Sequence, residues 1–237
     1  NFIDSDEVSS LNKRFDDIKS KKTYASIHKN IIELSAEETS MEPVFNNTNK
    51  IIRKYFVESL GLKNLQLTKL WLVTTTHSDV NQSQLPYVPH FDKLRYFKAM
   101  VYLHAITTNH GPIYLGKIKN EIDIEKRRKN LPDDYKTRGL NVINEQDLKE
   151  GLTPMVGDAG DVIFFDTNIP HKAGVLTEGH ERRVLRFDFE LPGLNPKSTL
   201  LRRIINKYFW EKIMFKKLIS KSPLLLFLLR NALIKYR

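Results

Sequence analysis

The stretch Val88-Pro-His-Phe-Asp92 places an imidazole and a carboxylate two residues apart, at His90 and Asp92. If the backbone is extended here, these two side chains point to the same side. Far along the chain, the apolar run Val162-Ile-Phe-Phe165 is followed by His171. Two histidines and one carboxylate on a β scaffold form the facial triad that binds Fe(II) and leaves coordination positions open. We therefore predict His90, Asp92 and His171 as metal ligands.

Simpler interpretations of the same residues exist. A His-x-Asp tripeptide occurs by chance, and Asp92 could instead cap a turn or pair with Lys93 or Arg95. Zn²⁺ also binds two histidines and an aspartate in hydrolases, although the sequence has no H-E-x-x-H pattern. The alternation of turns and apolar strands around the motif favours iron in a β-barrel.

Four pieces of sequence accompany His171 in a fixed order. They are His90-Phe-Asp92, Asn109-His-Gly-Pro-Ile-Tyr-Leu-Gly116, Gly160-Asp-Val-Ile-Phe-Phe-Asp166 and Arg182-Arg-Val-Leu-Arg-Phe-Asp-Phe189. Through them the chain resembles the phytanoyl-CoA dioxygenase family of Fe(II)/2-oxoglutarate-dependent oxygenases. The chain departs from this family at residues 115–119, which lack the usual Pro-Gly-Ser-His ending of that turn, so no role is transferred there.

This resemblance implies an α+β fold with a mainly β core, a double-stranded β-helix or jelly-roll (cupin-like) barrel. It implies Fe(II) held by His90, Asp92 and His171, with 2-oxoglutarate and O₂ as co-substrates. The implied reaction decarboxylates 2-oxoglutarate to succinate and hydroxylates an unactivated C–H bond. Related halogenases lack the carboxylate ligand, so the presence of Asp92 favours hydroxylation.

The resemblance also implies an arginine beyond His171 that binds the 2-oxoglutarate carboxylate. Arg182, Arg183 and Arg186 compete for this role, and a planar guanidinium suits bidentate carboxylate binding. Family spacing favours Arg182, with Arg183 as the second choice. Strand alternation places Arg182 in phase with Arg186, and Arg183 in phase with Leu185. We expect Arg186 to bind an acidic group of the substrate.

Helices are expected before strands. Residues 4–20 predict a helix capped by Asp4, residues 24–34 an apolar helical region, and residues 42–61 a further helix. Strands are expected at 65–76, 96–106, 113–115, 162–165 and 184–191. The charged segment 117–152 is expected to form an insertion on the barrel rim that could act as a lid. One dioxygenase domain over residues 1–196 accounts for this pattern.

The chain beyond residue 196 differs in charge and pattern. Of 38 basic and 28 acidic residues, 11 and 1 lie from Lys197 onward, which leaves 27 of each in residues 1–196. Residues 197–237 predict a basic amphipathic helical tail that lies on an anionic membrane surface. The alternatives are packing on the barrel or a dimer interface. Its longest apolar run, 224–229, is far shorter than the ~20 residues that span a bilayer.

Composition limits the remaining functions. The absence of cysteine excludes disulfides and thiolate metal sites and favours a reducing compartment. We therefore expect a cytoplasmic location with peripheral membrane association, a small or lipid-linked anionic substrate, and no nucleic-acid partner. Oligomeric state is not predicted. The competing hypothesis is a non-catalytic, membrane-associated binding module on a vestigial barrel, which the complete His90, Asp92 and His171 set argues against.

Overall fold

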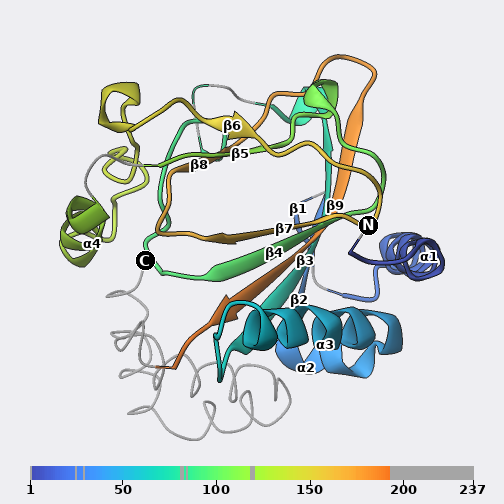
Figure 1. Ribbon diagram of the computed structural model, residues 1–237. Helices are drawn as coiled ribbons and strands as arrows, with labels where there is room; N and C mark the ends of the chain where they lie inside the picture. The colour runs from blue at the N-terminus through green and yellow to red at the C-terminus, as the bar shows by residue number, and fades with distance from the viewer. Residues whose placement is uncertain are drawn as a thin grey trace, which may run out of the picture.

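The computed structural model describes residues 2–24, 26–28, 30–80, 83, 85–117 and 121–192. Within these residues, two antiparallel sheets face one another, and helices cover the outer side of the larger sheet (Figure 1). The larger sheet has the order β1-β2-β3-β9-β4-β7, and the smaller has the order β6-β5-β8. The predicted jelly-roll architecture with a mainly β core is confirmed.

The strands of the larger sheet come from both ends of the described chain. They are β1 (Ser26–His28), β2 (Ile31–Ser35), β3 (Gln66–Thr76), β4 (Phe97–Tyr102), β7 (Val162–Asp166) and β9 (Glu181–Glu190). The long strands β3 and β9 pair along almost their whole length, from Gln66 opposite Glu190 to Thr76 opposite Glu181. β4 then pairs with both β9 and β7. The smaller sheet consists of β5 (Ile113–Leu115), β6 (Thr153–Pro154) and β8 (His171–Ala173).

Three N-terminal helices bury one face of the larger sheet. They are α1 (Ser5–Lys21), α2 (Ala36–Met41) and α3 (Pro43–Glu58). The Asp4 side chain accepts a hydrogen bond from the Glu7 amide at 2.8 Å, and Pro43 occupies the first turn of α3, as expected for helix starts. The buried stripe of α1, with Leu11 and Phe15, packs into the same core as Phe187 and Phe189 of β9.

Alternation along β9 separates two environments. Leu185, Phe187 and Phe189 belong to the core under the helices, whereas Arg182, Val184, Arg186 and Asp188 line a cavity between the sheets. Successive strand residues face opposite sides, so adjacent arginines in this strand have different surroundings. The phase relation expected from the sequence is confirmed.

The helical region expected at residues 24–34 is wrong. These residues contribute β1 and β2, which pair as a hairpin, and β2 pairs with β3 from Ile31 opposite Val73 to Ser35 opposite Lys69. Ile32 and Leu34 are buried while their neighbours are half-buried, which is the period-two pattern of a strand. The expected strand at 96–106 is shorter, ending at Tyr102, and α2 was not anticipated.

The expected insertion contains α4 (Glu121–Lys129) and two irregular segments around the short 3₁₀ helix Glu145–Asp147. Further 3₁₀ turns span His77–Asp79 and Thr108–His110. None of the helices in the described ranges is long and apolar enough to cross a bilayer. The basic tail predicted for residues 197–237 lies outside the described residues, so its membrane, barrel or dimer role stays a prediction.

Candidate metal centre

The three predicted ligands converge. One ligand atom from each of His90, Asp92 and His171 lies within 4.8 Å of the others. Asp92 Oδ1 is 3.8 Å from His90 Nε2 and 3.6 Å from His171 Nε2. The two histidines lie opposite each other in a β-bridge, with each backbone N–H donating to the other's carbonyl at 3.0 Å. That bridge joins ligands that are 81 positions apart in the sequence.

Both imidazole rings are oriented by backbone carbonyls. His90 Nδ1 lies 2.8 Å from the Val88 oxygen, and His171 Nδ1 lies 2.9 Å from the Ile169 oxygen. A carbonyl oxygen only accepts, so each Nδ1 carries the hydrogen, and the Nε2 lone pair of a neutral ring points toward Asp92. Such a contact fixes the tautomer and orientation of a metal-ligating histidine.

Lys98 of β4 holds the second oxygen of Asp92. Its Nζ donates to Asp92 Oδ2 at 2.6 Å, and Lys98 is 7% exposed. Burial alone would raise the pKa of Asp92, but Lys98 and His171 hold this pKa well below its usual range. Asp92 therefore remains a carboxylate, with Oδ1 directed to the histidines and Oδ2 bound to Lys98.

The role of Lys98 was not predicted from the sequence. The available signal was a lysine in the middle of the apolar run Phe97–Tyr102, because lysine is rarely buried unless it is paired.

Burial, together with the neighbouring His171, lowers the pKa of His90 to about 4. The ordinary value in an unfolded chain is about 6.5, so the unfolded state binds more protons between these two pH values. The contribution of His90 to the free energy of unfolding is therefore fully present above about pH 6.5. It falls by up to about 3 kcal/mol as the pH is lowered from 6.5 to 4.

We expect the free energy of unfolding of the metal-free protein to fall more steeply from pH 7 to 4.5 in wild type than in His90→Gln. Urea unfolding at several pH values measures both slopes. Equal slopes would contradict the assignment of a buried, neutral His90.

A cavity of about 1030 Å³ extends from the triad between the sheets. Arg182 lines this cavity, is 7% exposed, and donates to the Gly111 carbonyl and to Thr75 Oγ1. No carboxylate pairs with Arg182 among the residues that the structure describes, and burial lowers its pKa. An uncompensated buried cation is costly, and this one faces a cavity large enough for an anionic ligand.

The structure does not bring Arg183 to this cavity. Its Nη2 donates to Asp16 of α1 at 2.6 Å, and its guanidinium carbon lies 4.6 Å from the centre of the Phe15 ring. Arg183 is thus on the helix-covered side of β9. Of the two arginines predicted for 2-oxoglutarate, only Arg182 shares a cavity with the metal ligands.

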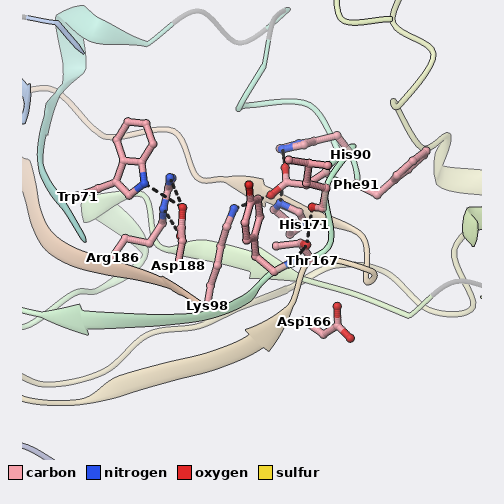
Figure 2. A network of polar contacts seen from close by, with 12 residues as sticks. Trp71, His90, Phe91, Lys98, Asp166, Thr167, His171, Arg186 and Asp188 are labelled. Carbon is pink, nitrogen blue, oxygen red and sulfur yellow. Dashed lines mark hydrogen bonds and ion pairs between the residues drawn. The ribbon is translucent and has the colours of Figure 1, made fainter. Parts of the chain in front are cut away.

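Arg186 lines the cavity but already has an anionic neighbour. Its Nε and Nη2 donate to the two oxygens of Asp188 at 3.0 and 3.1 Å, and it stacks on Trp71 at 4.5 Å. Trp71 Nε1 also donates to Asp188 at 2.8 Å. Lys98 lies between this group and the two histidines (Figure 2). Asp188 therefore already neutralises Arg186, and the substrate role expected for Arg186 stays a prediction.

Comparison with known proteins identifies structural neighbours only. No family model and no curated protein matches this chain in sequence. Among solved structures, the non-heme alpha ketoglutarate dependent carbocyclase SnoK from nogalamycin biosynthesis is 12% identical, with TM-score 0.55 over 85% of this chain and 83% of that chain. The epimerase SnoN of the same biosynthesis is 14% identical, with TM-score 0.54 over 80% and 75%. The chain has the fold of these 2-oxoglutarate-dependent enzymes.

EctD from S. alaskensis, with 2-oxoglutarate and 5-hydroxyectoine, is 13% identical, with TM-score 0.52 over 80% of this chain and 69% of that chain. Identities this low establish the shared fold alone. The narrower resemblance to the phytanoyl-CoA dioxygenase family therefore stays a prediction.

Proposed function

We propose that this protein is an Fe(II)/2-oxoglutarate-dependent dioxygenase that hydroxylates an unactivated C–H bond and converts 2-oxoglutarate to succinate. The observation that carries the proposal is a His90, Asp92 and His171 set in the same cavity as the buried Arg182, which has no carboxylate partner among the described residues. The fold supports it, because the similar solved structures include 2-oxoglutarate-dependent enzymes. Those enzymes are an epimerase and a carbocyclase, so proteins of this fold catalyse reactions of several kinds. We propose hydroxylation because the carboxylate of Asp92 is present.

The donor set fits Fe(II). Two imidazole nitrogens and one carboxylate oxygen are the donor set of the facial triad, and these three residues would hold Fe(II) while leaving positions open for co-substrates. Iron with 2-oxoglutarate and O₂ supplies the oxidising chemistry, while the protein supplies ligand geometry and orientation. The residues of this chain hold the ligands in their binding forms: backbone carbonyls fix both imidazoles, and Lys98 fixes the free oxygen of Asp92.

Arg182 fits one carboxylate of 2-oxoglutarate. Its guanidinium is inside the cavity and bonded only to neutral oxygens, those of Gly111 and Thr75, among the described residues. An incoming carboxylate would supply the missing charge and form charge-assisted hydrogen bonds. We propose this role for Arg182 and none for Arg183.

We further propose an anionic substrate, small or lipid-linked. Seven basic side chains line the cavity against three acidic ones, and Fe(II) and 2-oxoglutarate offset each other in charge. Two of the basic ones, Lys69 and Lys93, pair with Glu33 and Asp133 beside the cavity, which leaves an excess of two positive charges. The basic ones are Lys69, Lys93, Lys98, Lys136, Lys172, Arg182 and Arg186, and the acidic ones Asp79, Asp92 and Asp188. Arg186 remains a proposed substrate contact, acting together with Asp188. The absence of cysteine supports a cytoplasmic location, and the basic charge of residues 197–237 supports peripheral association with an anionic membrane.

The proposal is tested by anaerobic titration of the protein with Fe(II) and then 2-oxoglutarate. A weak visible charge-transfer band that needs both additions is expected, followed by succinate formation when O₂ is admitted. A folded protein that gives neither band nor succinate would eliminate the dioxygenase and leave the non-catalytic binding module.

A further inference from the structure

The turn that carries His90 and Asp92 is held largely from outside the two sheets. Phe91, between the two ligands, donates its N–H to the Asn141 carbonyl at 3.1 Å. The Asn141 side chain returns a hydrogen bond from Nδ2 to the Phe91 carbonyl at 2.9 Å. Because that carbonyl only accepts, the side-chain nitrogen must face it. Asn141 is 2% exposed and belongs to the insertion between β5 and β6.

The backbone carbonyls of Pro89 and Asp92 also accept hydrogen bonds from residues of the insertion. The Ile143 N–H donates to the Pro89 carbonyl at 2.8 Å, and Arg128 Nε donates to the Asp92 carbonyl at 3.0 Å. The His90 carbonyl accepts instead from His171. Every carbonyl from residue 89 to residue 92 therefore has a partner, and three of the four partners come from the insertion.

Side-chain packing joins the insertion to the same turn. Phe91 is fully buried and forms a cluster with Ile124, Ile143 and Leu148. The guanidinium carbons of Arg127 and Arg128 lie 5.1 and 5.8 Å from the centre of its ring. Opening this insertion as a free lid would expose Phe91 and break the hydrogen bonds that hold both flanks of the ligands.

We propose that Asn141 is a positioning residue for the metal site, and that docking of insertion residues 139–148 and metal binding stabilise each other. Ligand geometry must be set within a fraction of an ångström for tight metal binding. Asn141 sets it by clamping both backbone groups of the residue between the two ligands. The inference rests on the metal-binding part of the proposed function and on no assumption about substrate.

The first measurement tests the thermodynamic coupling between metal binding and docking of the insertion. If docking of the insertion favours metal binding, metal binding must favour docking by the same factor. Amide hydrogen exchange of the whole 237-residue chain is compared with and without Co(II) at about 100 times its Kd. Exchange at residues 139–148 should slow by about tenfold or more, whereas residues 8–18 of α1, on the other side of the larger sheet, should change less.

The second measurement uses matched variants. Asn141→Asp keeps the shape of the side chain but removes the N–H donor that faces the Phe91 carbonyl. Asn144→Asp introduces the same charge three residues away, where the side chain is exposed. Co(II) affinity and the visible absorption spectrum of the Co(II) site report ligand geometry without turnover. We expect Asn141→Asp to lower Co(II) affinity by 10- to 100-fold, about the loss caused by removing groups that orient ligands, and Asn144→Asp to leave it unchanged.

The outcomes distinguish failure of the role proposed for Asn141 from failure of the proposed metal binding. Wild type that binds Co(II) while the two variants bind equally well would overturn the role of Asn141 and leave the dioxygenase intact. Wild type that does not bind Co(II) would remove both. If Asn141→Asp does not fold, the exchange experiment on wild type decides alone: protection confined to residues 88–92 and 169–173 would overturn the coupling.

Discussion

Replacing His171 by alanine is expected to eliminate the Fe(II)- and 2-oxoglutarate-dependent visible band and all succinate formation. His171 Nε2 lies 3.6 Å from Asp92 Oδ1, and its backbone forms the bridge to His90. The alanine variant retains that bridge but leaves two ligands instead of three. Changes to groups that only orient ligands already cost 10- to 100-fold in metal affinity, so loss of a ligand should cost more than about 100-fold.

His180→Ala is the matched control. His180 lies outside the cavity, next to His110, with Nδ1 3.4 Å from His110 Nε2. This variant should retain the band and the wild-type Fe(II) affinity. If His171→Ala keeps the band while remaining folded, the ligand assignment is wrong, and a different set of residues must bind the metal.

Replacing Arg182 by methionine is expected to lower 2-oxoglutarate affinity by roughly 10- to 100-fold. Hydrogen bonds to charged groups contribute about 1.5–3 kcal/mol, and each 1.4 kcal/mol is a factor of ten in affinity. Fe(II) binding should be unchanged, because Arg182 contacts Gly111 and Thr75 and none of the ligands. The concentration of 2-oxoglutarate needed for half of the band intensity measures the effect.

Arg182→Met should weaken 2-oxoglutarate binding without lowering the stability of the protein. Arg182 is buried with no carboxylate partner in the described part of the chain, so its removal should not lower the melting temperature of the protein without 2-oxoglutarate. Arg183→Met is the neighbouring control: it removes a pair with the exposed Asp16, worth about 1 kcal/mol or less. If Arg183→Met weakens 2-oxoglutarate binding and Arg182→Met does not, the two arginines have been assigned in the wrong order.

Local sequence patterns were sufficient to predict many of the helices and strands. The capped, amphipathic residues of α1 and the Pro-initiated α3 form helices because caps and a 3.6-residue apolar period act over a few positions. The period-two pattern of β9 likewise separated Arg182 from Arg183, since adjacent strand residues face opposite sides. The short hairpin of β1 and β2 was missed, because pairing with β3 overrode an ambiguous apolar run.

At the candidate metal centre, local sequence patterns predicted some of the residues but not the contacts between them. The sequence by itself predicted His90, Asp92 and His171 as the ligand set, from their spacing, the apolar strand nearby and the family resemblance, and the structure brings these three side chains together. Only the tertiary structure decided that Lys98 binds Asp92, that Arg186 is neutralised by Asp188, and that the insertion clamps Phe91. Those contacts join residues on different strands or across a long insertion, and no local preference of the chain encodes such pairings. They form because the two sheets and the insertion pack together.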